Sequence, residues 1–266
     1  MPIDSLIDPK APPEKIADGF KFTEGPVFSR RGYLLFSDIP NNRIMKWERG
    51  QLTVYRDNSN GANGLTFDHQ GRLLACEKGR VTRTEKNGSV TVLASDGLQG
   101  PNDLVYSIDG SVYFTDLPQS KVYRISRERS GVGGAPPLGG VTVVAEDCVA
   151  PNGVALSPNQ QKLYVADSKR RLVQAYAIAA DGALRNSRQF AECRGDGLKT
   201  DESGNVWVAS EGVVRVFDQT GKELGTIAVP ESPSNLCWGP GFRGIYVTAR
   251  TSVYFLRTKV SGTRTF

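Results

Sequence analysis

A short pattern that recurs six times constrains the fold more than any other feature of the sequence. Each copy places a Glu, Asp or Asn just before an apolar, strand-like run, as in Thr23-Glu24-Gly25-Pro26-Val27-Phe28. The six polar positions lie 39 to 50 residues apart and are Glu24, Asn63, Asn102, Asn152, Asp196 and Asn235. A fixed period of this length is typical of repeat architectures, propellers among them.

Each copy continues with the same series of strands. A turn rich in Gly, Asp or Asn leads into a strongly β-forming second strand, such as Val112 to Asp116. A third strand alternates apolar and polar residues, as from Lys121 to Ile125, and most copies add a fourth, such as Val90 to Ala94. The longest interval contains a Gly- and Pro-rich stretch from Ser130 to Gly140, which we interpret as a loop.

Four strands in each repeat predict an all-β fold, a six-bladed β-propeller with four-stranded antiparallel blades. The last copy runs out after three strands, near Leu256, whereas a strand-like segment from Glu14 to Gly19 precedes the first copy. We therefore expect this N-terminal strand to complete the last blade and close the ring, which hides the sheet edges. The prediction is a single domain over residues 1–266, with residues 1–13 as an N-terminal tail.

Charge and hydropathy argue against several classes of partner. The formal net charge is +5, but the basic residues are scattered apart from Lys169-Arg170-Arg171, and no accompanying motif indicates nucleic-acid binding. We see no signal peptide and no apolar run long enough to span a membrane, so we expect a cytoplasmic protein without a membrane partner. The four cysteines lack metal-type CxxC spacing. For the oligomeric state, the sequence is compatible with either a monomer or a dimer.

The six polar side chains are expected to meet at one mouth of the central channel, because the innermost strand of each blade lines the axis. Two interpretations compete. Turn formation before each strand accounts well for Asn63-Gly64 and Asn152-Gly153. It does not account for Glu24, or for Asp196 at the same phase of the repeat. Two carboxylates and up to four amides that face one axis favour a bound cation.

Ligands that are all oxygen atoms select a hard ion, so we expect one divalent cation, Ca²⁺ first, with Mg²⁺, Mn²⁺ or Zn²⁺ as alternatives. The single histidine, His69, lies in a predicted surface turn. A mechanism with a histidine base at the axis is therefore excluded. The general base must be a carboxylate or a metal-bound hydroxide.

Six stretches together suggest a family. They are Phe22 to Val27, Leu35 to Ile44, Pro101 to Leu104, Tyr113 to Asp116, Pro151 to Gly153, and Gly195 to Lys199. In order and spacing they resemble the gluconolactonase branch of the senescence-marker-protein, gluconolactonase and luciferin-regenerating-enzyme family, over about Lys21 to Ser252. The resemblance implies a six-bladed propeller whose relatives hydrolyse lactones, or organophosphates in the related diisopropyl fluorophosphatases.

The resemblance also implies roles for individual residues. The metal ligands would be Glu24, Asn102, Asn152 and Asp196. Asp196 would be both a ligand and the candidate base or nucleophile, and Asp103, which follows the matched Asn102, is an alternative base or a support for the ligands.

The predicted function is a metal-dependent lactonase that opens a small-molecule lactone or ester to a hydroxy acid. The metal would bind the carbonyl oxygen while Asp196 activates a water molecule or attacks directly. The alternatives are an organophosphate or other ester hydrolase, an isomerase or lyase at the same metal site, and a non-catalytic metal-binding propeller, because fold does not determine reaction.

Overall fold

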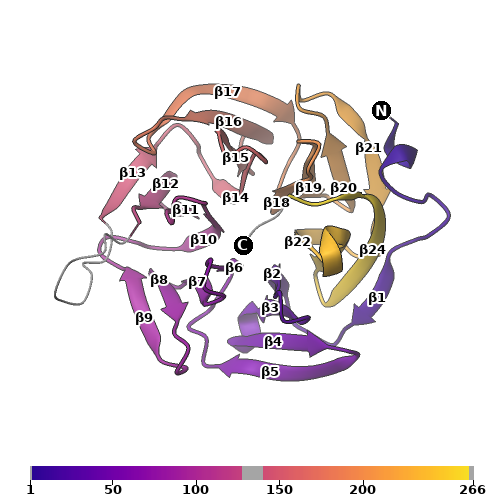
Figure 1. The fold of residues 1–266 in the computed structure, drawn as a ribbon, viewed down its shortest axis with the longest axis horizontal. Coiled ribbons are helices and arrows are strands. Elements are labelled where there is room, and N and C mark those ends of the chain that lie inside the picture. Colours follow the sequence, from indigo (N-terminus) through magenta and orange to yellow (C-terminus); the bar gives the residue numbers. More distant parts are fainter. Residues whose placement is uncertain (1, 128–139, 264–266) are drawn as a thin grey trace.

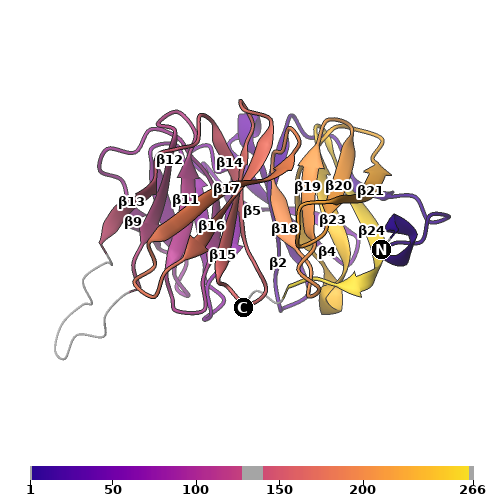
Figure 2. The same cartoon turned by 90° about the horizontal axis from the view of Figure 1, so that it is seen from above.

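The computed structural model describes residues 2–127 and 140–263. Their strands form six four-stranded antiparallel sheets, which surround a central axis as the blades of a propeller (Figure 1). Seen from the side, the blades form a disc whose two faces carry the loops (Figure 2). The predicted all-β, six-bladed architecture is confirmed.

The blades follow one another along the chain. Blade 1 contains β2 (Thr23–Phe28), β3 (Leu34–Asp38), β4 (Arg43–Glu48) and β5 (Gln51–Asp57). Blade 2 contains β6 (Leu65–Phe67), β7 (Leu73–Glu77), β8 (Arg80–Thr84) and β9 (Val90–Ala94). Blade 3 contains β10 (Pro101–Tyr106), β11 (Val112–Asp116), β12 (Lys121–Ile125) and β13 (Val141–Ala145). Blade 4 contains β14 (Pro151–Leu156), β15 (Lys162–Asp167), β16 (Leu172–Ile178) and β17 (Leu184–Glu192). Blade 5 contains β18 (Leu198–Thr200), β19 (Val206–Ser210), β20 (Val213–Phe217) and β21 (Glu223–Ala228). Blade 6 contains β22 (Pro233–Trp238), β23 (Arg243–Ala249), β24 (Ser252–Ser261) and β1 (Glu14–Ala17).

The ring closes as predicted, because β1 pairs antiparallel with β24 and becomes the outer strand of blade 6. The residues before β1 also contact the disc. They include the short 3₁₀ turn η1 (Ile3–Ser5), and Leu6 and Ile7 are buried in the apolar cluster shared by blades 5 and 6.

The core lies between the blades. In the described part of the chain, each of the six junctions between neighbouring blades holds one apolar cluster. At the junction of blades 5 and 6, the rings of Trp207 and Trp238 meet edge to face with centroids 5.4 Å apart. The second strands β3, β7, β11 and β19 are buried along their whole length, which explains their nearly continuous apolar runs. This packing fixes the inner strands that line the channel.

Helical structure in residues 2–127 and 140–263 is confined to η1, η2 (Ile39–Asn41) and η3 (Pro240–Phe242), and none of these turns could cross a bilayer. The predicted loop from Ser130 to Gly140 lies, except for Gly140, outside the described residues.

Candidate functional site

The starts of the inner strands, together with the ends of the second strands β3 and β11, are linked in a ring around the axis, with one hydrogen bond or more at every blade junction. The links are Ser37 Oγ to Asn63 O (2.7 Å), Gly64 N to Asn102 O (2.8 Å), Thr115 Oγ1 to Asn152 O (2.6 Å), Gly153 N to Asp196 O (3.1 Å), Gly197 N to Ser234 O (2.8 Å) and Ser234 Oγ to Thr23 O (2.7 Å). Since the six polar positions belong to these segments or adjoin them, the ring gathers them at one end of the channel.

The glycines that follow several polar positions permit this close approach. A Cβ atom on Gly153 would lie 2.2 Å from the carbonyl oxygen of Asp196, and one on Gly197 would lie 2.0 Å from Asn235 Oδ1. Asn152 and Gly153 are part of strand β14. The interpretation of Asn152-Gly153 as a turn is therefore wrong, because this glycine lets two blades meet rather than reversing the chain.

Irregular pairing reorients the polar side chains. Four inner strands change register at or beside their polar position, and in β10 the shift lies between Pro101 and Leu104. A bulge of this kind redirects neighbouring side chains relative to a regular strand. Within it, Asn102 is partly exposed, whereas Asp103 is only 2% exposed.

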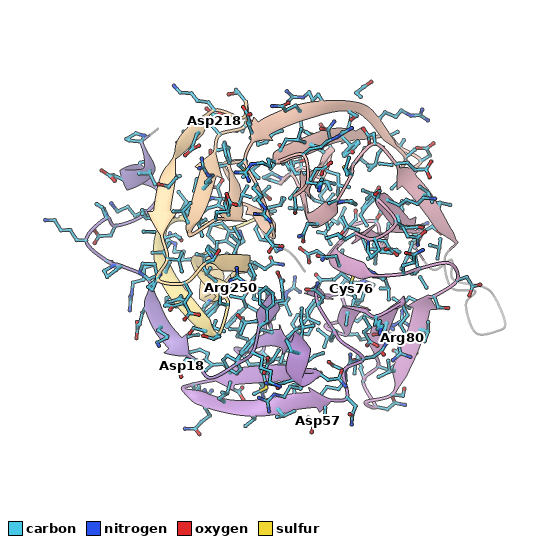
Figure 3. The ribbon with its side chains drawn as sticks, turned by 180° about the vertical axis from the view of Figure 1, so that it is seen from behind. Asp18, Asp57, Cys76, Arg80, Asp218 and Arg250 are labelled. Carbon is cyan, nitrogen blue, oxygen red and sulfur yellow. The ribbon has the colours of Figure 1, made fainter. Side chains whose placement is uncertain are left out.

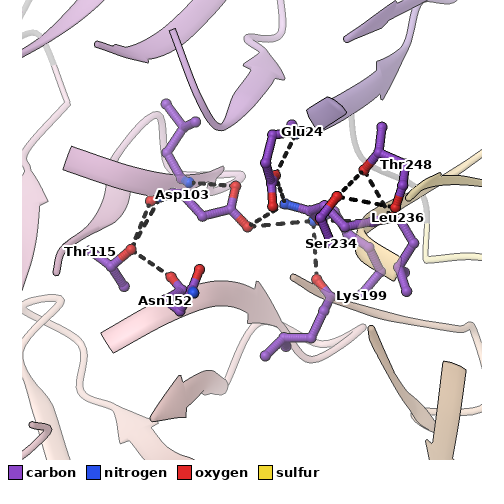
Figure 4. A network of polar contacts seen from close by, with 12 residues as sticks. Glu24, Asp103, Thr115, Asn152, Lys199, Ser234, Leu236 and Thr248 are labelled. Atoms are coloured by element: carbon purple, nitrogen blue, oxygen red, sulfur yellow. Dashed lines mark hydrogen bonds and ion pairs between the residues drawn. The ribbon is translucent and has the colours of Figure 1, made fainter. Parts of the chain in front are cut away.

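Asn235 joins two of the predicted site carboxylates. Its Nδ2 donates to Glu24 Oε2 at 3.0 Å and to Asp103 Oδ2 at 3.3 Å (Figure 4). Its Oδ1 accepts the backbone N–H of Leu236 at 2.8 Å. Glu24 Oε2 also accepts the N–H of Gly25 at 2.5 Å. Asn235 therefore acts as a donor that holds Glu24 and Asp103 together, although the sequence analysis placed it only in the polar ring.

Lys199 brings a positive charge to the same cluster. Its Nζ lies 4.0 Å from Asp103 Oδ2 and donates to the carbonyl of Leu198 at 3.0 Å. Lys199 also lines an apolar cavity of about 290 Å³ farther along the channel, together with side chains such as Leu65, Leu104 and Trp238. The lysine thus lies between the carboxylates and this cavity. The sequence analysis did not include Lys199 in the site, although its position three residues after Asp196 on an inner strand could have indicated it.

Two carboxyl groups of the cluster hold protons unusually tightly. Burial raises the pKa of Glu24 well above its usual range, and the negative charges of Asp196 and Asp103 add to this effect. Desolvation likewise raises the pKa of Asp196 to about 7, together with the charge of Asp103. A hydrogen bond from Asn152 opposes that rise. The cluster therefore carries more negative charge than its surroundings offset.

Two amide oxygens in the ring also lack a partner. Asn63 Oδ1 and Asn152 Oδ1 are buried and accept no hydrogen bond. A buried oxygen without a donor is costly and calls for an explanation, such as an ion. Within residues 2–127 and 140–263, no three His, Cys, Asp or Glu side chains form a metal-binding group. A cation here would need amide oxygens beside its carboxylates, and such a mixed oxygen set fits a hard divalent ion.

The structure places the predicted site residues as follows. Glu24 and Asp103 meet through Asn235, and Asp196 interacts with Asn152 and with the charge of Asp103. Asn102 belongs to the same ring, where its carbonyl oxygen accepts the N–H of Gly64.

Comparison with known proteins gives consistent matches over nearly the whole chain. The family model described as the SMP-30/Gluconolactonase/LRE-like region matches residues 22–251. A gluconolactonase of Zymomonas mobilis is 30% identical over an alignment that covers 98% of this chain and 85% of that protein. The pentonolactonase XacC of Haloferax volcanii is 27% identical and covers 85% of this chain and 80% of its own. The structure of a gluconolactonase from Xanthomonas campestris superposes with a TM-score of 0.86 at 28% identity, covering 96% and 92% of the two chains.

Proposed function

Because the chain belongs to the SMP-30/gluconolactonase/LRE-like family, we propose that it is a hydrolase that opens a lactone to a hydroxy acid with the help of one divalent cation. The observation that carries the proposal is the cluster at the channel mouth, where buried carboxyl groups with raised pKa values adjoin amide oxygens that have no partner. The named lactonases among its relatives support the reaction class.

Glu24, Asn102, Asn152 and Asp196 would hold the cation, and Ca²⁺ is the first candidate because every donor atom is oxygen. Asn63 Oδ1 is a further oxygen that could bind the cation, and the sequence analysis did not include it among the ligands. When bound, such an ion supplies positive charge that stabilises the oxyanion of the opening lactone.

The residues of the chain have separate tasks in this reaction. Asp196 accepts a proton from water, whose oxygen attacks the lactone carbonyl carbon, and the ring C–O bond then breaks as Asp196 returns that proton to the ring oxygen. A bound cation would lower the pKa of Asp196 below its metal-free value of about 7 and keep the group ionised, as a general base must be. Asn235 keeps Glu24 in place, and Lys199 offsets the charge of Asp103.

The test compares Asp196→Asn with wild type in hydrolysis of glucono-1,5-lactone, followed with a pH indicator. Asp218→Asn is the matched control, since Asp218 is partly exposed in the loop between β20 and β21, where its Oδ1 accepts hydrogen bonds from Thr220. We expect Asp196→Asn to lose at least about a hundredfold in turnover, as for loss of a general base, while its circular dichroism spectrum stays unchanged.

Chelation with EDTA should likewise abolish hydrolysis and leave the fold intact, and Ca²⁺ should restore it. Full activity of Asp196→Asn, or activity that survives complete chelation, would contradict the proposal. Turnover of an aryl phosphotriester in place of every lactone would contradict the reaction class alone.

A further inference from the structure

Arg250 is a positively charged side chain beside the carboxylate cluster. It is exposed in the two-residue turn between β23 and β24, and it lies close to the axis on the face shown in Figure 3. Its backbone is hydrogen-bonded to Thr23, the residue directly before Glu24. Arg250 therefore lies beside the proposed reaction centre.

Both ends of Arg250 are anchored to the residues just before Glu24. Its carbonyl oxygen accepts the N–H of Thr23 at 2.8 Å and the hydroxyl of Thr23 at 3.3 Å. Its guanidinium carbon lies 5.7 Å from the centroid of the Phe22 ring, within the range of a cation–π contact. A side chain held in this way loses little freedom when it binds a ligand.

The charge of Arg250 is available to a ligand, in contrast to that of Arg194, which lies two residues before Asp196. Arg194 pairs with Glu211 at 2.8 Å, and Glu211 also pairs with Arg171 at 3.0 Å. Across the described ranges, Arg250 forms no ion pair with a carboxylate. The nearby Glu231 accepts hydrogen bonds from Thr251 and Ser252 instead.

We propose that Arg250 is the anion-recognition residue of this site, and that its preferred substrates are lactones with a carboxylate or phosphate group. A guanidinium group binds either anion through two parallel N–H donors, which is why arginine suits this task better than lysine. This inference rests on the proposed lactonase function and adds a substrate class to it.

The test uses two matched pairs of lactones. Glucaro-1,4-lactone carries a carboxylate that glucono-1,4-lactone lacks, and 6-phosphoglucono-1,5-lactone carries a phosphate that glucono-1,5-lactone lacks. Wild type should have a higher kcat/KM for a charged lactone than for its neutral partner. The pair with the larger difference identifies the preferred anion.

Arg250→Met should lower kcat/KM for the preferred charged lactone by about tenfold to a hundredfold, as expected for loss of a charge-assisted hydrogen bond, and mainly through KM. The neutral partners should change less than about threefold. Arg250→Lys should fall between wild type and Arg250→Met. Arg49→Met is the matched control, because Arg49 is also exposed in a two-residue turn with positive φ, at the opposite end of a blade.

The outcomes separate the two proposals. If Arg250→Met lowers charged and neutral lactones equally, or lowers neither, the recognition role is wrong while the lactonase function stands. A wild type that prefers the neutral member of both pairs would also overturn the recognition role. If wild type hydrolyses none of the four lactones, the proposed function fails, and the role of Arg250 fails with it.

Discussion

Replacing Asn235 by Asp tests the central contact of the site with almost no change in shape. The substitution exchanges Nδ2, which donates at 3.0 Å to Glu24 and at 3.3 Å to Asp103, for an oxygen that cannot donate to either and adds a negative charge beside Asp103. The bond to Glu24, whose raised pKa keeps it protonated, contributes about 0.5–1.5 kcal/mol and the bond to the charge of Asp103 about 1.5–3 kcal/mol, so loss of both should cost about 3 kcal/mol in the metal-free protein. For a domain of this size, that corresponds to a fall in Tm of about 6–12 °C.

Calcium should stabilise Asn235→Asp more than it stabilises wild type. The new carboxylate adds an oxygen ligand and a negative charge beside Glu24, so the rise in Tm on adding Ca²⁺ should be larger in Asn235→Asp than in wild type. The assay is thermal unfolding followed by circular dichroism, once in EGTA and once in excess CaCl₂. Asn87→Asp is the control, because Asn87 is exposed and its Oδ1 accepts from Ser89.

Two results would refute this reasoning. One is a variant that is as stable as wild type in EGTA, which would mean that the bridge between Glu24 and Asp103 contributes little to the fold. The other is a calcium-induced shift in Tm no larger than that of wild type, which would mean that no divalent ion binds near Asn235.

Two further predictions concern the ring and its charges. Gly153→Ala should destabilise the protein by several kcal/mol, because its Cβ would lie 2.2 Å from a backbone oxygen that cannot move aside. Gly140→Ala, whose Cβ would meet no atom of the described residues within 4 Å, should cost less than about 0.5 kcal/mol. Urea unfolding measures both, and equal costs would contradict the close-approach argument. The raised pKa of Asp196 means that the metal-free folded state binds a proton which the unfolded state releases near pH 4, so stability should fall as pH rises from about 4 to about 7. In EGTA, the Tm of wild type should therefore fall relative to that of Asp196→Asn as the pH rises from about 4 to about 7. A difference in Tm that does not change with pH would show that Asp196 has no raised pKa.

The architecture could be predicted from the sequence because it depends on periodic features. Each blade repeats the same strand order, and the apolar runs of β7 and β11 report burial on both faces. The closure of blade 6 by β1 also followed from counting strands, since the last repeat lacked one. These features are set by local propensity and by the need to cover sheet edges, both of which can be read along the chain.

The internal contacts of the site could not be predicted in the same way. The direction of the Asp103 side chain depends on the register shift in β10, and that shift leaves no clear mark in the residue pattern. The bridge from Asn235 to Glu24 joins residues 211 positions apart, so it exists only once the ring has closed. The pair Asn152-Gly153 resembles a turn signal, and only the approach of the next blade reveals why glycine is needed.

The charges of the site suggest why it would take a divalent ion. Glu24, Asp103 and Asp196 would together carry three negative charges if all were ionised, and in the described structure Lys199 Nζ lies 4.0 Å from one of them, Asp103. A divalent cation and Lys199 would balance this charge. Without the ion, burial away from water and the repulsion between these carboxylates favour protonation, which raises the pKa values of Glu24 and Asp196. Cation binding and protonation should therefore compete for the same oxygens. Arg250 pairs with no carboxylate in the described residues, so its guanidinium group stays available for the substrate.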